Sequence, residues 1–88
     1  MTGGKTKSGF KFNVDENVFK DWDFVTLTDT VRQGNGTMKD VNALLTMVLG
    51  EKGFEDLKTH IRKKNGYADV ELVKAEFEEI VNATKLKN

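Results

Sequence analysis

The feature that most constrains the fold is a helical pattern of apolar residues between two glycines, Gly36 and Gly50. Apolar side chains recur at intervals of three and four residues over 38–49, which predicts a helix with one broad apolar face. The residues of that face are Met38, Val41, Leu44, Leu45, Val48 and Leu49. Thr37 is the expected N-cap, and Asp40 lies three residues later, as in a capping box. Because its stripe must be buried, this helix is predicted to form the centre of the core.

Three more segments have helical spacing, so the predicted fold class is mainly α, with about four helices in a small bundle. The segments are 16–33, 51–64 and the stretch that follows Asp69. The chain has no proline, so glycines and capping residues are expected to set the helix ends. Gly66, after a basic helix end, is one such stop.

The first predicted helix has two apolar faces. One face carries Val18, Trp22 and Val25, and the nearly opposite face carries Phe24, Leu27 and Val31. Two faces need two partners, so we expect one face to be in the core and the other to be free for binding. The alternative is that both faces are buried, between the strand and two other helices. Residues 25–31 also alternate with period two and include several β-branched residues, which leaves a strand as the alternative.

Ahead of this helix, Phe10, Phe12 and Val14 alternate with polar residues, which predicts a short N-terminal strand or extended arm. Its free backbone groups could pair with a neighbouring chain, so a homo-oligomer is expected. Residues 1–8 contain little that can be buried and are predicted to be a disordered leader, either a native tail or a remnant of cloning. A single small helical domain is expected over residues 9–86.

Charge and composition exclude several functions. The 14 basic residues are balanced by 14 acidic ones, which argues against a general nucleic-acid binder. Apolar runs are too short to span a membrane, and the absence of cysteine is compatible with the cytosol. With one histidine and no cysteine, the sequence predicts no metal site and no cofactor.

No catalytic residue is predicted either. His60 has no cysteine to activate, and Ser8, the one serine, belongs to the leader. The chain is therefore expected not to be an enzyme. His60 and the cations Arg62, Lys63 and Lys64 form a basic helix end that could contact nucleic acid, although cations also stabilise helix C-termini.

Four stretches, "SGFKFNVDE", "KDWDF", "LLTMVLGEKGFEDL" and "HIRKKNGYADVELVKAEFEEIV", occur in an order that resembles the small tail assembly chaperones of long-tailed (siphovirus-type) bacteriophages and prophages of Gram-positive bacteria. The resemblance covers about residues 8–82. It implies a helical, non-catalytic protein that binds the tape-measure protein and tail-tube subunits in the host bacterial cytoplasm and is absent from the mature virion. The alternative is a small phage or host regulator that contacts nucleic acid through the basic helix end.

A chaperone of this type needs exposed apolar side chains. The residues expected to bind the partner are Trp22, Phe24, Leu27, Val31 and Met47, which fall outside the main apolar stripes or on the second face of the first helix. Trp22 fits a core position as well, because Val18 and Val25 lie on its face. Phe10, Phe12 and Val14 are the residues expected to join neighbouring copies.

Overall fold

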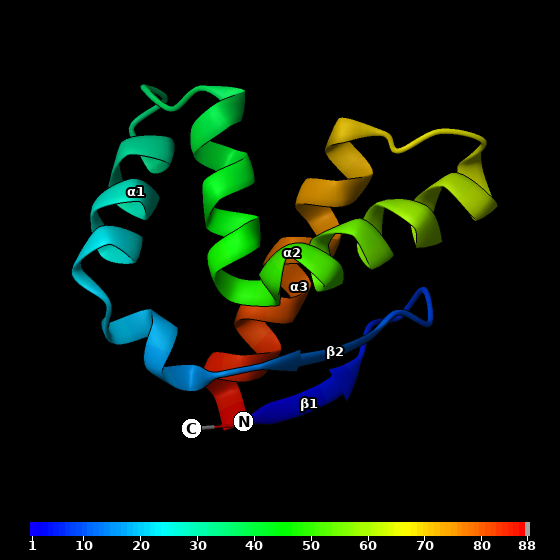
Figure 1. Cartoon of the computed structure of the whole chain (residues 1–88), viewed down its shortest axis with the longest axis horizontal. Helices are drawn as coiled ribbons and strands as arrows, with labels where there is room; N and C mark the ends of the chain where they lie inside the picture. The colour runs from blue at the N-terminus through cyan, green and yellow to red at the C-terminus, as the bar shows by residue number, and fades with distance from the viewer. Residues whose placement is uncertain (88) are drawn as a thin grey trace.

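The computed structural model describes residues 1–87, and these form a two-stranded antiparallel sheet, a short 3-10 helix and three α-helices (Figure 1). The elements in chain order are β1 (Thr2–Lys5), β2 (Lys11–Val14), η1 (Glu16–Lys20), α1 (Trp22–Arg32), α2 (Met38–Asn65) and α3 (Val70–Lys87). The mainly α prediction is confirmed. The predicted count of four helices is wrong, because the two segments that flank Gly50 form one bent element, α2.

The bend in α2 is centred on Gly50, whose backbone (φ 79°, ψ 165°) is far from helical. Other residues rarely adopt this conformation, which explains why a glycine stands here. The first half of α2 runs beside α1, and the second half turns away across the molecule (Figure 1). The bend at Gly50 therefore sets the angle between the two halves of α2, and with it the direction in which each half presents its apolar stripe to the core.

We expect Gly50→Ala to lower the free energy of unfolding by about 1–3 kcal/mol, because the added methyl group makes this backbone conformation unfavourable. A Cβ atom at Gly50 would meet no atom within 4 Å, so the loss would come from the backbone and not from a clash. Urea denaturation measures it, and Glu51→Ala, at the exposed neighbouring helical position, is the control. Equal stability of the two variants would show that the bend is not under this constraint.

Residues 1–8, expected to be disordered, are ordered instead. β1 pairs with β2 in the register Thr2 to Val14 and Lys5 to Lys11, and a tight turn at residues 7–9 joins them. Gly9 has a φ of 96°, as three-residue hairpin turns require. The expectation was wrong because β1 is held by backbone hydrogen bonds and by threonines, which composition alone does not distinguish from a flexible segment.

The predicted strand is present as β2, but it is not a free arm. Phe10, Phe12 and Val14 are all buried against the helices of the same chain. Their proposed role in joining copies is therefore corrected: the apolar side of the hairpin closes this chain's own core. β1 lies against α3, and β2 lies against α2.

The predicted single helix over 16–33 is interrupted at Asp21, whose backbone is extended (φ −72°, ψ 132°). Its carboxylate accepts a hydrogen bond from the Phe24 amide at 3.0 Å and so caps α1. Residues 25–31 are helical, so the strand alternative is wrong. The other caps follow the sequence: Thr37 and Asp40 form the capping box of α2, and Asp69 accepts bonds from the first amides of α3.

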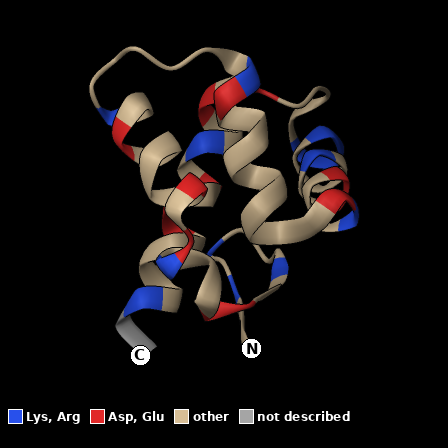
Figure 2. Cartoon of the chain, turned by 60° about the vertical axis from the view of Figure 1, so that its left-hand side comes forward, with Lys and Arg blue, Asp and Glu red and all other residues tan. Residues whose placement is uncertain are grey.

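The core is one cluster whose buried apolar side chains come from β2 and the residue before it, from α1, α2 and α3, and against which Val18 and Phe19 of η1 pack. Its buried apolar members are Phe10, Phe12, Val14, Phe24, Leu44, Leu45, Val48, Leu57, Ile61, Val73 and Ile80. The first half of α2 has no charged side chain after its first turn, whereas charges crowd its second half (Figure 2). The low charge of the first half of α2 agrees with the prediction that this segment forms the centre of the core.

Candidate functional site: an apolar groove between the first and third helices

α1 presents to the core the face that the sequence assigned to a partner. Phe24 is 5% exposed, and Leu27 and Val31 pack against the core, whereas Trp22 is 83% and Val25 53% exposed. Within α1, the second face was expected to bind the partner but lies against the core, and Trp22 and Val25 lie on the exposed face. Val18, predicted on the face of Trp22, belongs to η1 and packs against the core. Periodicity locates the faces of a helix and carries no information on which one meets the core.

Beside this face lies a groove of about 410 Å³, within the size range of ligand sites. Its apolar floor comes from α1, the first half of α2 and α3, and consists of Phe24, Val31, Val41, Leu44, Phe77 and Val81. Its polar rim consists of Thr28, Arg32, Lys74, Glu78, Asn82 and Lys85. α1 packs on α2 and η1, and α1 and α3 lie on either side of the first half of α2 (Figure 1). The residues that line the groove come from all three helices.

Two of the five predicted partner-binding residues, Phe24 and Val31, line this groove. Leu27 and Met47 are half-buried and pack against the core, and Trp22 projects from the start of α1 outside the groove. The contributions of Phe77 and Val81 could not be singled out from the sequence, because both lie on the apolar stripe of α3, a pattern typical of core positions.

The clearest polar cluster ties the hairpin turn to the helices. The Thr6 hydroxyl, in a residue that is 4% exposed, donates to a Glu76 carboxylate oxygen at 3.0 Å and accepts from the Phe10 amide at 3.1 Å. The Lys7 amide donates to Glu79 at 2.8 Å, and the Lys64 ammonium donates to the Ser8 carbonyl. The bonds of Thr6 satisfy a buried hydroxyl, and the bonds to Glu76, Glu79 and Lys64 hold the hairpin turn against α2 and α3.

Ser8 also lies near His60, which the sequence did not predict: the Ser8 hydroxyl oxygen is 3.0 Å from His60 Nε2. The Glu76 carboxylate contacts this same hydroxyl and Thr6. In a serine–histidine–acid triad the acid instead bonds the other imidazole nitrogen and orients the ring. The cluster therefore lacks the order of contacts that activates a serine, and its role in the fold is to anchor the hairpin.

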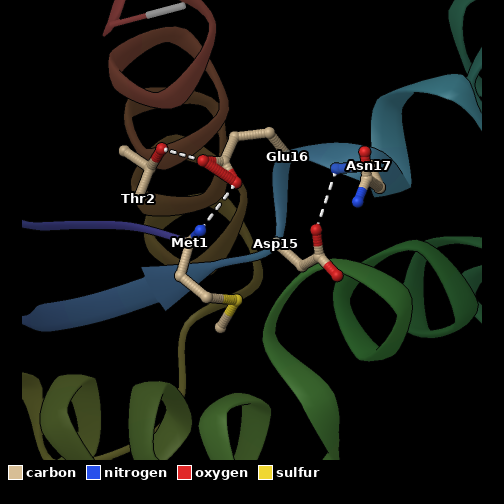
Figure 3. A network of polar contacts seen from close by, with 5 residues as sticks. All are labelled: Met1, Thr2, Asp15, Glu16 and Asn17. Atoms are coloured by element: carbon tan, nitrogen blue, oxygen red, sulfur yellow. Dashed lines mark hydrogen bonds and ion pairs between the residues drawn. The ribbon is translucent and has the colours of Figure 1, made fainter.

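A second polar cluster joins the start of β1 to η1. Glu16 accepts a hydrogen bond from the Thr2 hydroxyl at 2.8 Å and pairs with the Met1 ammonium at 3.1 Å (Figure 3). Its own backbone amide, then the Thr2 hydroxyl and the ammonium, lower the pKa of Glu16 from 4.5 to about 2. The neighbouring Asp15 accepts from the Asn17 amide and caps η1.

This pKa predicts an acid-dependent contribution to stability. A carboxyl group whose pKa is depressed on folding stabilises the fold above its unfolded pKa and loses that contribution as the pH falls from about 4.5 to about 2. Glu16→Gln is therefore expected to flatten the pH dependence of urea unfolding in this range. Glu51→Gln, at an exposed position of α2, controls for the lost charge. Identical pH profiles for wild type and Glu16→Gln would contradict the prediction.

The basic end of α2 is partly engaged within the chain. Lys64 reaches the hairpin turn, while Arg62 and Lys63 are exposed in the last turn of the helix. Gly66, with a φ of 91°, closes the helix as predicted. The acidic Glu76 and Glu79 lie close to the same turn, so this end of the molecule carries both signs of charge.

Within residues 1–87, no helix has the length and apolar character needed to cross a membrane. Comparison of the chain with protein-family models, with curated proteins and with solved structures found no match.

Proposed function

We propose that this chain is a non-catalytic binding protein that holds an apolar helical segment of a partner in the groove between α1 and α3. The observation that carries the proposal is the groove itself, with six apolar side chains on its floor and a volume of about 410 Å³. Apolar grooves between helices accept the apolar face of a partner helix, which is read through side chains at helical spacing. The residues of the groove are Phe24, Val31, Val41, Leu44, Phe77 and Val81.

The biological role that we propose is that of a phage tail assembly chaperone acting in the host bacterial cytoplasm. This rests on the resemblance of residues 8–82 to that family, and the proposed partners are the tape-measure protein and tail-tube subunits. A tape-measure protein is long, helical and apolar, so it offers many segments of the kind that the groove would accept. Several copies of the chain would then cover one partner.

The experiment is co-expression of the chain with the tape-measure protein of a long-tailed phage of Gram-positive bacteria. The proposal predicts that the tape-measure protein stays in the soluble fraction and co-purifies with the chain. The chain with Val81→Gln, in the groove, should retain less of it than the chain with Leu72→Gln, at an exposed position of the same helix. Aggregation of the partner regardless of the chain would count against the proposal.

A further inference from the structure

The rim of the groove carries more positive than negative charge. Arg32 on α1 and Lys74 and Lys85 on α3 supply three cations, and Glu78 supplies one carboxylate. The chain as a whole has a net charge of zero, so this excess is local. A local excess of one sign beside an apolar floor selects partners of the opposite sign.

The cations are available to a ligand. Among the ion pairs formed by the described residues, which join Met1 to Glu16, Lys52 to Asp56 and Lys58 to Glu55, none uses a residue of the groove rim. The Lys85 ammonium lies 5.6 Å from the centre of the Phe19 ring, a contact that leaves its donors free for a carboxylate. The three rim cations therefore form no ion pair among the described residues and can pair with an anionic ligand.

The cations lie at both ends of the groove. Lys85 lies near the start of α1, because its ammonium is over Phe19, and the Phe19 ring packs against that of Phe24 with centroids 5.5 Å apart. Lys74 lies at the other end, because it also lines the smaller pocket beside Met38 at the start of α2. Lys74 and Lys85 are eleven positions apart in the sequence, which corresponds to about 16 Å of helix, or about three turns.

We propose that the groove selects an amphipathic helix with acidic flanks, whose carboxylates are about three turns apart and meet Lys74 and Arg32 at one end and Lys85 at the other. This rests on the proposed function of the groove and adds the charge of its partner. The apolar stripe of the partner helix lies on the floor, and its acidic residues pair with the rim. Such pairs are exposed, so they set selectivity and salt dependence more than total affinity.

The test uses three synthetic helical peptides that share one leucine stripe and carry Glu, Gln or Lys on both flanks. Their binding to the chain is measured by fluorescence anisotropy at low and high salt. We expect the Glu-flanked peptide to bind about tenfold more tightly than the Lys-flanked one at low salt, because several exposed pairs together amount to that ratio. Added salt should reduce the difference.

A triple variant, Arg32→Glu with Lys74→Glu and Lys85→Glu, should reverse the preference. Its control places the same three charge reversals at Lys39, Arg62 and Lys63, which are exposed and outside the groove. The control should keep the preference for the Glu-flanked peptide, and circular dichroism verifies that both variants are folded. A local effect of the rim is thereby separated from a change of net charge.

Each remaining outcome overturns the proposal in a distinguishable way. Equal binding of all three peptides, weakened by Val81→Gln, would refute the acidic partner and leave the groove as a binding site. Binding of none of them would count against the groove function itself. If the chain self-associates and the rim variant abolishes this, the occupant is a second copy and not an acidic helix of another protein.

Discussion

Replacing Leu57 by alanine is expected to lower the free energy of unfolding by about 2–5 kcal/mol. Leu57 is fully buried in the second half of α2, within the cluster that also contains Leu45 and Ile80. The substitution removes apolar contacts and leaves a cavity that the close-packed surroundings fill only in part. A domain of this size has only about 5–15 kcal/mol of total stability, so the variant should be partly unfolded well below the wild-type midpoint.

Urea denaturation followed by far-UV circular dichroism measures the loss. Leu72→Ala is the matched control, because it makes the same chemical change at a leucine that is 44% exposed on α3. Its effect should stay within about 0.5 kcal/mol, as for ordinary surface positions. If Leu57→Ala and Leu72→Ala lowered the free energy of unfolding equally, the core would not be packed around the second half of α2.

The second large effect concerns binding. We expect the double variant Val31→Gln and Val81→Gln to bind the Glu-flanked helical peptide about 30-fold more weakly than the wild type. The two valines face the groove from α1 and α3, and each should contribute about 1 kcal/mol when the peptide covers it. Glutamine has a good helix propensity and is uncharged, so the substitutions leave the charge of the groove rim unchanged.

Fluorescence anisotropy again gives the affinity, and the control is Trp22→Gln with Val25→Gln on the outer face of α1. These side chains are exposed and outside the groove, so their loss should leave the affinity nearly unchanged. If the control variant weakened binding and the groove variant did not, the binding surface would be the outer face of α1. Trp22 would then have the partner-binding role that the sequence suggested.

The helices could be predicted from the sequence where spacing and caps agree. In α2 the stripe, the Thr37 cap and Gly66 specify the two ends, and the structure has them, whereas Gly50, predicted to separate two helices, is a bend within one. The break at Asp21 was missed, although an aspartate three residues before Phe24 is an N-cap signal. β1 could not be predicted, because its pairing depends on backbone groups and on Thr6, whose partner Glu76 is 70 residues away.

The site was predictable only in part, for a related reason. The pattern of α1 shows two apolar faces, but which face is covered depends on where η1, α2 and α3 lie. Trp22, the first residue after the Asp21 cap, is exposed, whereas Phe24, two residues later, is buried. The groove needs α1 and α3 to face each other across α2, an arrangement between segments about 50 residues apart that no local pattern specifies.

The most direct test of the groove is to titrate the ¹³C-methyl-labelled chain with the Glu-flanked peptide and to follow the side-chain NMR signals. Binding in the groove predicts that the methyl signals of Val31, Val41, Leu44 and Val81 shift together and saturate at one peptide per chain. The indole signal of Trp22 and the methyl signals of Leu72 should stay in place. Shifts concentrated at Trp22 and Val25, with the groove methyl groups unchanged, would contradict a binding site between α1 and α3.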